Sequence, residues 1–364
     1  MYKVVTVIGA RPQFVKAAVV SRALRTRCEE IVVHTGQHYD HGLSGIFFEQ
    51  LGMPAPTHNL AVGSGSHARQ TADALQRIEQ VLQSERPDLL LIYGDTNSTL
   101  AAALAAVKLC LPIAHVEAGP RLYSWQEPEE VNRIVADRFA ALLFCATRTD
   151  VANLEREGIR DGVFLSGDVM LDLFMNMRES ARDTSMLESL DLTPGEYLLA
   201  TVHRARNTDS DERIKSIFEA FLQAEEPVVL PLHPRTAKNL QRVGWYDRVA
   251  GAPHIRLLEP LGYIEFMNLQ LDARMILTDS GGVCREAYFA RRPCLTLFPF
   301  TAWPETVEDG WNICVDADTE KILAAIRNFS PDHDQRNVFG NGNASEIITE
   351  AIVGYLDDPR PLYA

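Results

Sequence analysis

The sequence predicts an α/β protein built from two doubly wound domains, and three observations support this prediction. Short apolar runs alternate with amphipathic stretches along the whole chain, which is the pattern of parallel strands covered by helices. The runs are continuously apolar, as expected for strands that are buried on both faces. The chain has 364 residues, which is enough for two domains of ordinary size.

The first series of strands and helices forms a predicted N-terminal domain, residues 1–180. Its helices are clearest at 67–83 and 99–110, where apolar residues recur with helical spacing. Its predicted strands are 3–9, 29–36, 88–95, 112–119, 141–147 and 162–168.

A second series of the same kind predicts a C-terminal domain over residues 190–345. The polar stretch 175–195 ends in a turn-rich segment that is typical of a link between domains. Residues 346–364 hold the end of a last amphipathic helix and a tail, which could pack back on the N-terminal domain. The predicted strands of this series are 197–203, 227–233, 254–260, 274–280, 294–300 and 312–317.

Composition excludes several classes of partner. The net charge of −14 is unfavourable for binding nucleic acid or an anionic membrane. No apolar run is long enough to span a membrane, and the N-terminus lacks a signal-peptide pattern. The six cysteines show no metal-binding spacing and fit buried thiols in a reducing cytoplasm, so we expect no metal site.

Two Rossmann-type domains in tandem would face each other across a central cleft, with ligands beyond the carboxyl ends of the strands. The first strand ends in GARPQFVK (9–16), where Arg11 and Lys16 would add positive charge at a helix start. A turn with two solvated cations is the alternative. The second strand ends with Gln37 and His38, for which a surface turn is equally good.

Three carboxylates follow at or near strand ends, namely Asp95 in GDTNS (94–98), Glu117 in HVEAGPR (115–121) and Glu129 in PEEVNR (128–133). Asp95 could simply cap the next helix, since Asp is a strong N-cap. Thr96 and its neighbours could cap that helix equally well, which would free Asp95 to act on a ligand.

The other two acids also have structural alternatives. A buried Glu117 needs a partner, and Arg121 could form a salt bridge with it. Glu129 and Arg133 are four residues apart and share a helix face, so they could form a stabilising pair. All three alternatives would have to hold for the acidic cluster to carry no function.

The C-terminal domain carries the expected anion site. His203 and Arg204 end its first strand, and His233 with Arg235 repeats the arrangement at the next strand. TDSGGVCREA (278–287) runs from a strand into a helix. Its residues Ser280, Gly281 and Gly282 would present backbone amides to a phosphate, and Glu286 would reach a ribose. A plain tight turn is the alternative. Carboxylates together with a diphosphate site predict proton chemistry on a nucleotide-linked substrate.

These motifs, in this order and spacing, resemble the non-hydrolysing UDP-N-acetylglucosamine 2-epimerases. The resemblance runs over roughly residues 3–312 and is carried by GARPxxxK, TGQH, GDTNS, HVEAGxR, PEExNR, HR and LTDSGG. Within the family, GARPQF, HPRT, EAYF and the ending Trp303-x-Glu305 to Asn312 look closest to the UDP-2,3-diacetamido-2,3-dideoxyglucuronate 2-epimerases.

The resemblance implies a GT-B-like fold and C2 epimerisation of a UDP-linked 2-acetamido sugar, by elimination and re-addition of UDP through a glycal. It implies no cofactor, a homodimer and a role in surface-polysaccharide synthesis. Its catalytic residues would be Asp95, Glu117, Glu129 and His203. Its substrate-binding residues would be Arg11, Lys16, Gln37, His38, Arg121, Arg133, Arg204, His233, Ser280, Gly281, Gly282 and Glu286.

The chain departs from the family's pattern at Pro120, Arg206, Cys284 and Phe298. These departures concern sugar specificity and leave altered activity open. Three alternative functions follow. A hydrolysing 2-epimerase would release UDP, a GT-B glycosyltransferase would need an acceptor, and a non-catalytic protein would bind a UDP-sugar without turnover.

Overall fold

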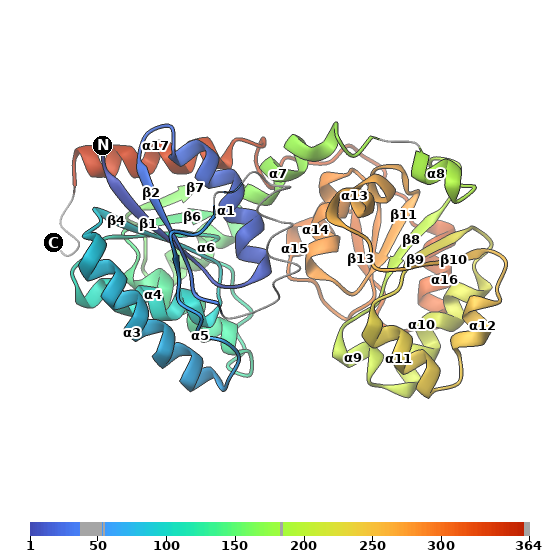
Figure 1. Ribbon diagram of the computed structural model, residues 1–364. Coiled ribbons are helices and arrows are strands. Elements are labelled where there is room, and N and C mark those ends of the chain that lie inside the picture. The colour runs from blue at the N-terminus through green and yellow to red at the C-terminus, as the bar shows by residue number, and fades with distance from the viewer. Residues whose placement is uncertain (37–52, 54, 183–184, 360–364) are drawn as a thin grey trace. The chain divides into compact units, whose positions relative to one another are not determined.

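The chain forms two compact units, which Figure 1 shows as two groups of strands and helices. The computed structural model describes residues 1–36, 53, 55–182 and 185–359, without the side chains of Arg11 and Pro12. Unit 1 comprises Met1–Leu173 and Asn337–Ala364, and unit 2 comprises Phe174–Arg336.

Unit 1 is built on a seven-stranded parallel sheet in the order β3-β2-β1-β4-β5-β6-β7. This is the doubly wound order, in which the direction of winding reverses between β1 and β4. The strands are β1 Lys3–Ile8, β2 Glu29–His34, β3 His58–Asn59, β4 Leu89–Tyr93, β5 Ile113–Val116, β6 Leu142–Cys145 and β7 Val163–Leu165.

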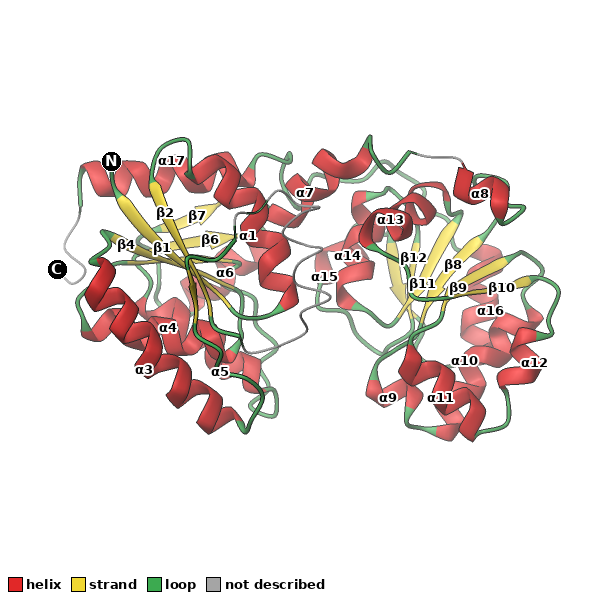
Figure 2. Cartoon of the chain, in the orientation of Figure 1, coloured by secondary structure: helices red, strands yellow, loops and turns green. Residues whose placement is uncertain are grey.

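Helices cover both faces of this sheet (Figure 2). One face packs on α3 and α4 through a core that includes Ile78, Leu90 and a run of alanines in α4. On the other face α1 packs against α17. The helices are α1 Arg11–Leu24, α3 His67–Glu85, α4 Asn97–Lys108, α5 Pro128–Phe139, α6 Arg148–Arg156, α7 Val169–Arg178 and α17 Ala344–Asp357.

Unit 2 repeats the plan with a six-stranded parallel sheet in the order β10-β9-β8-β11-β12-β13, so its winding reverses between β8 and β11. The strands are β8 Leu198–Thr201, β9 Val228–Pro231, β10 Ile255–Leu258, β11 Met275–Thr278, β12 Cys294–Thr296 and β13 Asn312–Cys314. The helices are α8 Ser185–Ser189, α9 Ala205–Thr208, α10 Asp211–Gln223, α11 Pro234–Arg242, α12 Tyr246–Ala250, α13 Tyr263–Asp272, α14 Gly281–Phe289, α15 Pro304–Glu308 and α16 Thr319–Asn328.

Each strand expected from the sequence is present, and among the strands of the described residues only the two-residue β3 was not expected. The units divide the chain differently from the expected domains 1–180, 190–345 and 346–364. The division falls inside α7, between Leu173 and Phe174, and residues from Asn337 onward join unit 1. Asp172 explains part of this division, because its carboxylate accepts the backbone N–H groups of Ala344 and Ser345. None of the helices within the described ranges combines the length and the apolar character needed to cross a membrane.

Candidate active site

The acidic part of the site in unit 1 is formed by residues that follow the ends of β1, β4 and β5. Gly9 follows β1, and the side chains of Ser98 and Thr35 leave no room there for a larger residue. A Cβ on Gly9 would lie 2.2 Å from Ser98 Oγ and 2.4 Å from Thr35 Oγ1. The tight packing brings the turns after β1 and β4 together, where the winding of the sheet reverses.

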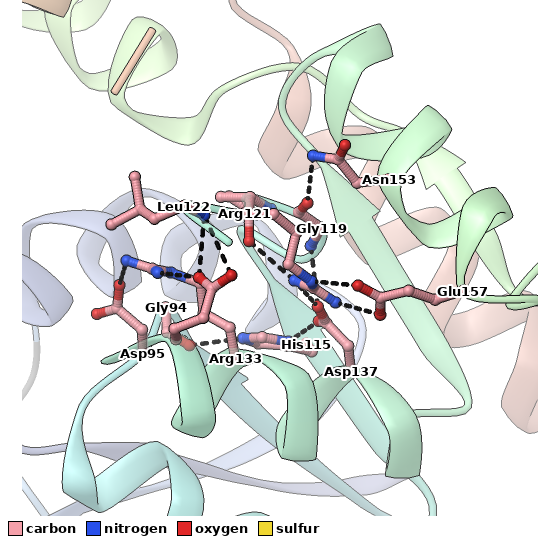
Figure 3. Close-up of polar contacts among 12 residues, drawn as sticks. Gly94, Asp95, His115, Gly119, Arg121, Leu122, Arg133, Asp137, Asn153 and Glu157 are labelled. Atoms are coloured by element: carbon pink, nitrogen blue, oxygen red, sulfur yellow. Dashed lines mark hydrogen bonds and ion pairs between the residues drawn. The ribbon is translucent and has the colours of Figure 1, made fainter. Parts of the chain in front are cut away.

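Asp95 is free of the capping role that was its alternative. Thr96 caps α4, because its side chain accepts the N–H of Thr99. The carboxylate of Asp95 instead forms an ion pair with Arg133, with Oδ2 2.7 Å from Nη2, as Figure 3 shows. Its side chain remains 30% exposed, so it is held in place while a ligand can still reach it.

Glu117 adopts a backbone conformation that side chains rarely take. It follows β5 with φ of 68°, in the left-handed region. Its carboxylate pairs with the ammonium group of Lys16, which is buried. The alternative in which Glu117 forms a salt bridge with Arg121 is therefore not what the structure shows.

Arg121 is committed elsewhere. Its side chain is fully buried, with Nη1 2.8 Å from Asp137 Oδ2 and Nε 2.7 Å from Glu157 Oε1 (Figure 3). Its Nη2 donates a further bond to Glu157 at 2.8 Å. These contacts use the guanidinium within unit 1, so we assign Arg121 to holding the loop after Glu117 in place.

His115 and Asp137 join the ends of two strands below the acidic residues. His115 Nε2 lies 2.7 Å from the carbonyl oxygen of Gly94, and its Nδ1 lies 2.7 Å from Asp137 Oδ1. Asp137 also accepts the N–H of Gly119. This network was not predicted from the sequence. Its signal was a histidine inside an apolar strand, since a buried polar group needs a partner.

Glu130, which was not among the predicted site residues, organises the start of α5. It is buried, accepts the N–H groups of Leu122 and Tyr123, and lies 2.9 Å from Arg133 Nη1. The alternative in which Glu129 pairs with Arg133 is therefore not what the structure shows, because Arg133 pairs with Glu130 and Asp95. Glu129 is exposed in the first helical turn, where the helix dipole favours a negative charge.

A pocket of about 440 Å³ opens beside this cluster. It lies among α3, α4 and α5 and is lined by mostly apolar atoms, with Asn97 and Asn132 as polar members. Asn132 also donates a bond to the carbonyl oxygen of Asp95. Of the earlier candidates, Gln37 and His38 lie outside the described residues, as does the side chain of Arg11.

In unit 2, Asp279 aligns the loops after β8 and β11. Its buried carboxylate accepts the N–H groups of His203 at 3.0 Å and Arg204 at 3.0 Å, and the Nδ2 of Asn207 at 3.0 Å. The two strands are also joined by Thr201 and Thr278, whose hydroxyls are 2.6 Å apart. Asp279 was within an expected motif but was assigned no role there.

His203 and His233 lie together, with ring centroids 5.6 Å apart. Burial lowers the pKa of His203 below its usual value, although Asp279 opposes this shift. The neutral imidazole is therefore favoured near neutral pH, as a hydrogen-bonding group. His233 caps α11, because its Nδ1 accepts the N–H of Arg235.

The Ser280–Gly282 loop begins α14 as expected. Ser280 is the N-cap, and its side chain accepts the N–H of Val283. Trp303 Nε1 donates a hydrogen bond to the carbonyl oxygen of Gly281 at 2.9 Å. The first turn of a helix leaves its N–H groups without acceptors inside the helix, here those of Gly281 and Gly282. This geometry can bind an anion.

The interior of α14 holds two polar groups. Glu286 is buried and accepts a bond from Gln270 Nε2 at 3.2 Å. Cys284 is also buried, and Asn312 Nδ2 lies 3.1 Å from its Sγ. Hydrogen bonds, chiefly with Cys294, lower the pKa of the Cys284 thiol to about 7 although burial opposes this.

Known proteins resemble this chain over nearly its full length. Residues 22–353 match the family model of UDP-N-acetylglucosamine 2-epimerase. A UDP-N-acetylglucosamine 2-epimerase homolog from Methanococcus maripaludis is 47% identical over 353 residues, which cover 96% of this chain and 99% of the relative. The UDP-2,3-diacetamido-2,3-dideoxy-D-glucuronate 2-epimerase of Pseudomonas aeruginosa is 43% identical, over 96% of this chain and 98% of its own.

A solved structure agrees with the sequence relatives. The UDP-GlcNAc 2-epimerase of Methanocaldococcus jannaschii, in complex with UDP-GlcNAc and UDP, superposes with a TM-score of 0.84 at 38% identity. The match covers 97% of this chain and 99% of that one.

Proposed function

Because the chain belongs to the UDP-N-acetylglucosamine 2-epimerase family, we propose that it inverts C2 of a UDP-linked 2-acetamido sugar. The substrate is UDP-GlcNAc or a 2,3-diacetamido uronate relative, as in the names of the similar enzymes. One observation carries the proposal: Asp95 and Glu117 stand at the ends of neighbouring strands, each held by a cation.

The reaction needs a leaving group and two acid/base groups. As the bond between C1 and the UDP oxygen breaks, its electrons leave with UDP, and the positive character at C1 acidifies the proton on C2. A carboxylate removes that proton, and the electrons of the C–H bond form the C1–C2 double bond of a glycal. A second acid then protonates the opposite face of C2, and UDP adds back to C1.

The groups of unit 1 suit the proton transfers. In our proposal Asp95 and Glu129 exchange the proton with C2, while Glu117 and Lys16 orient the sugar. The ion pair with Arg133 keeps Asp95 in one position, and preorganised groups of this kind reduce the cost of reaching the transition state.

The groups of unit 2 suit the departing diphosphate. In our proposal the amides of Gly281 and Gly282 bind phosphate oxygens, neutral His203 donates a hydrogen bond, and Arg204 supplies charge. Glu286 binds the ribose. The chemistry requires no net oxidation or reduction.

Deuterium exchange at C2 tests the proposal. We expect proton NMR in heavy water to show the C2 signal of UDP-GlcNAc or of its diacetamido-uronate relative disappearing with the wild-type protein. Asp95→Asn or Glu117→Gln should slow this exchange by about 100-fold or more while UDP still binds. The exposed Glu155→Gln is the matched control.

Normal exchange in the Asp95 or Glu117 variant would remove that residue from the mechanism. The same samples separate the alternatives. Free sugar with UDP as final products indicates a hydrolysing enzyme, and UDP binding without exchange indicates a non-catalytic binder. A sugar transferred to an added acceptor indicates a glycosyltransferase.

Two further parts of the proposal concern the protein as a whole. All six cysteines are free, which fits the reducing cytoplasm where we place the protein. We also propose a homodimer, which sedimentation at several concentrations would test. A monomer at every concentration would contradict it.

A further inference from the structure

Two arginines of unit 2 lie over one phenylalanine ring. The Cζ atom of Arg204 is 5.1 Å from the ring centroid of Phe298, and that of Arg206 is 5.0 Å from it. Phe298 is buried, whereas both arginines are exposed. Stacking on an aromatic ring holds a guanidinium in place and leaves its N–H groups, which lie in its plane, available to an anion.

The sheet order places this pair beside the start of α14. Strand β11 lies between β8 and β12, so the loop after β8 reaches across the end of β11 to Phe298. A Cβ added to Gly281 would lie 3.6 Å from Arg204 Nη2. Asn207 fixes the loop, since its Nδ2 donates to Asp279 and to the carbonyl oxygen of Leu297, next to Phe298.

The nearby acids form their ion pairs with other arginines, although the charge of Arg206 also acts on the carboxylate of Asp316. Arg213 is paired with Asp316, and Arg235 with Asp209. Neither Arg204 nor Arg206 forms an ion pair within the part of the chain that the structure describes. In a protein of net charge −14, two exposed and unpaired cations beside a helix N-terminus indicate a site for an anionic ligand.

The amides at the start of α14, Arg204 and Arg206 together offer more anion-binding groups than a diphosphate requires. The amides at the start of α14 and Arg204, which lies next to them, match the two phosphates of a nucleoside diphosphate. Arg206, which lies in α9, adds a further full charge beside the same Phe298 ring. A third negative group on the ligand would match it.

We propose that Arg206 binds a carboxylate on the sugar and so selects a UDP-linked uronic acid over a neutral UDP-hexose. This inference rests on the proposed function, because it takes the UDP site at α14 as given. A guanidinium can bind a carboxylate with two parallel hydrogen bonds, and the Phe298 ring lies against the guanidinium of Arg206.

A pair of probes that differ only at C6 tests the inference without turnover. UDP-glucuronate carries a carboxylate where UDP-glucose carries a hydroxymethyl group. We expect calorimetry to show the wild-type protein binding UDP-glucuronate about tenfold or more tightly than UDP-glucose. Arg206→Gln should reduce this preference to about twofold or less, and Arg206→Lys should retain part of it.

Arg248→Gln is the matched control, because Arg248 is another exposed arginine of unit 2 that stacks on an aromatic ring, that of Trp245. It should leave the preference unchanged. Equal binding of the two probes by the wild-type protein, or an unchanged preference in Arg206→Gln, would overturn the inference.

Turnover is measured separately, so the two proposals can fail independently. A carboxylate preference that depends on Arg206, together with no exchange at C2 of either substrate, would refute the epimerase activity and keep the inference. Exchange with no such preference would refute the inference and keep the activity.

Discussion

Glu117 combines a strained backbone conformation with a proposed role in orienting the substrate. A non-glycine residue with φ of 68° costs free energy, and such residues persist where the surrounding structure holds them. Here Lys16 pairs with the carboxylate, and the N–H of Glu117 donates to the carbonyl oxygen of Phe144. The strain directs the side chain toward Lys16, as the proposed orienting role requires.

The burial of His203 predicts the sign of a pH dependence of stability. Because burial lowers its folded-state pKa below the unfolded value of about 6.5, the unfolded chain binds more protons as the pH falls. We therefore expect the free energy of unfolding to decrease between about pH 7.5 and pH 5.5. The buried His34, whose pKa is also lowered by burial, contributes in the same direction.

Urea unfolding at a series of pH values measures this dependence, and His203→Gln should make it weaker. If the free energy of unfolding of His203→Gln depends on pH as steeply as that of the wild-type protein, His203 does not cause the dependence. NMR titration of the ring protons gives an independent reading of the same pKa.

At the scale of elements, the ends of adjacent parallel strands are locked together by buried carboxylates. In unit 1 Asp137 links the loops after β4 and β5 through His115 and Gly119. In unit 2 Asp279 links the loops after β8 and β11. Each carboxylate accepts several N–H groups, so it fixes the loops that carry the proposed site.

Asp279→Asn tests this role. The amide replaces one acceptor oxygen by a donor that faces the N–H groups of His203 and Arg204. We expect a loss of about 2 kcal/mol in the free energy of unfolding and weaker UDP binding, because buried donors lose their acceptor. Thermal unfolding and UDP calorimetry measure the two effects, with the exposed Asp247→Asn as control. If Asp279→Asn binds UDP with full affinity, the loops after β8 and β11 keep their positions without the carboxylate of Asp279.

At the scale of the whole molecule, the C-terminal segment completes unit 1. Asp172 in α7 accepts the N–H groups of Ala344 and Ser345 and the hydroxyl of Ser345, at the start of α17. Gly167 is needed for the same crossing, because a Cβ there would lie 2.8 Å from the carbonyl oxygen of Phe339. The chain therefore returns to unit 1 after unit 2 is complete.

Removing the Asp172 carboxylate should loosen α17. We expect Asp172→Ala to lower the free energy of unfolding by about 2 kcal/mol, because three donors lose their acceptor at the end of a helix. Hydrogen exchange should be faster in α17 and in α1, which packs against it. The exposed Glu179→Ala should change neither. Unchanged protection of α17 in Asp172→Ala would contradict the capping role.

Individual residues show which parts of the site could be read from the sequence. Asp95 was correctly predicted to follow a strand, and Ser280 was correctly predicted to start a helix. Both positions depend on residues nearby in the sequence. Partners distant in the sequence were not found. Lys16 and Glu117 are separated by about a hundred residues, and nothing local indicates that they meet. Glu130 was passed over for Glu129 because adjacent helical residues point in different directions.

The sequence by itself determined the α/β class, the strands and the motifs at their carboxyl ends, because apolar periodicity and turn residues act locally along the chain. The tertiary structure alone decided which charges pair, where unit 1 ends, and that Arg204 and Arg206 share one aromatic ring. These features depend on strand order and on packing between distant segments, and strand order brings together side chains whose separation along the chain carries no sign of contact.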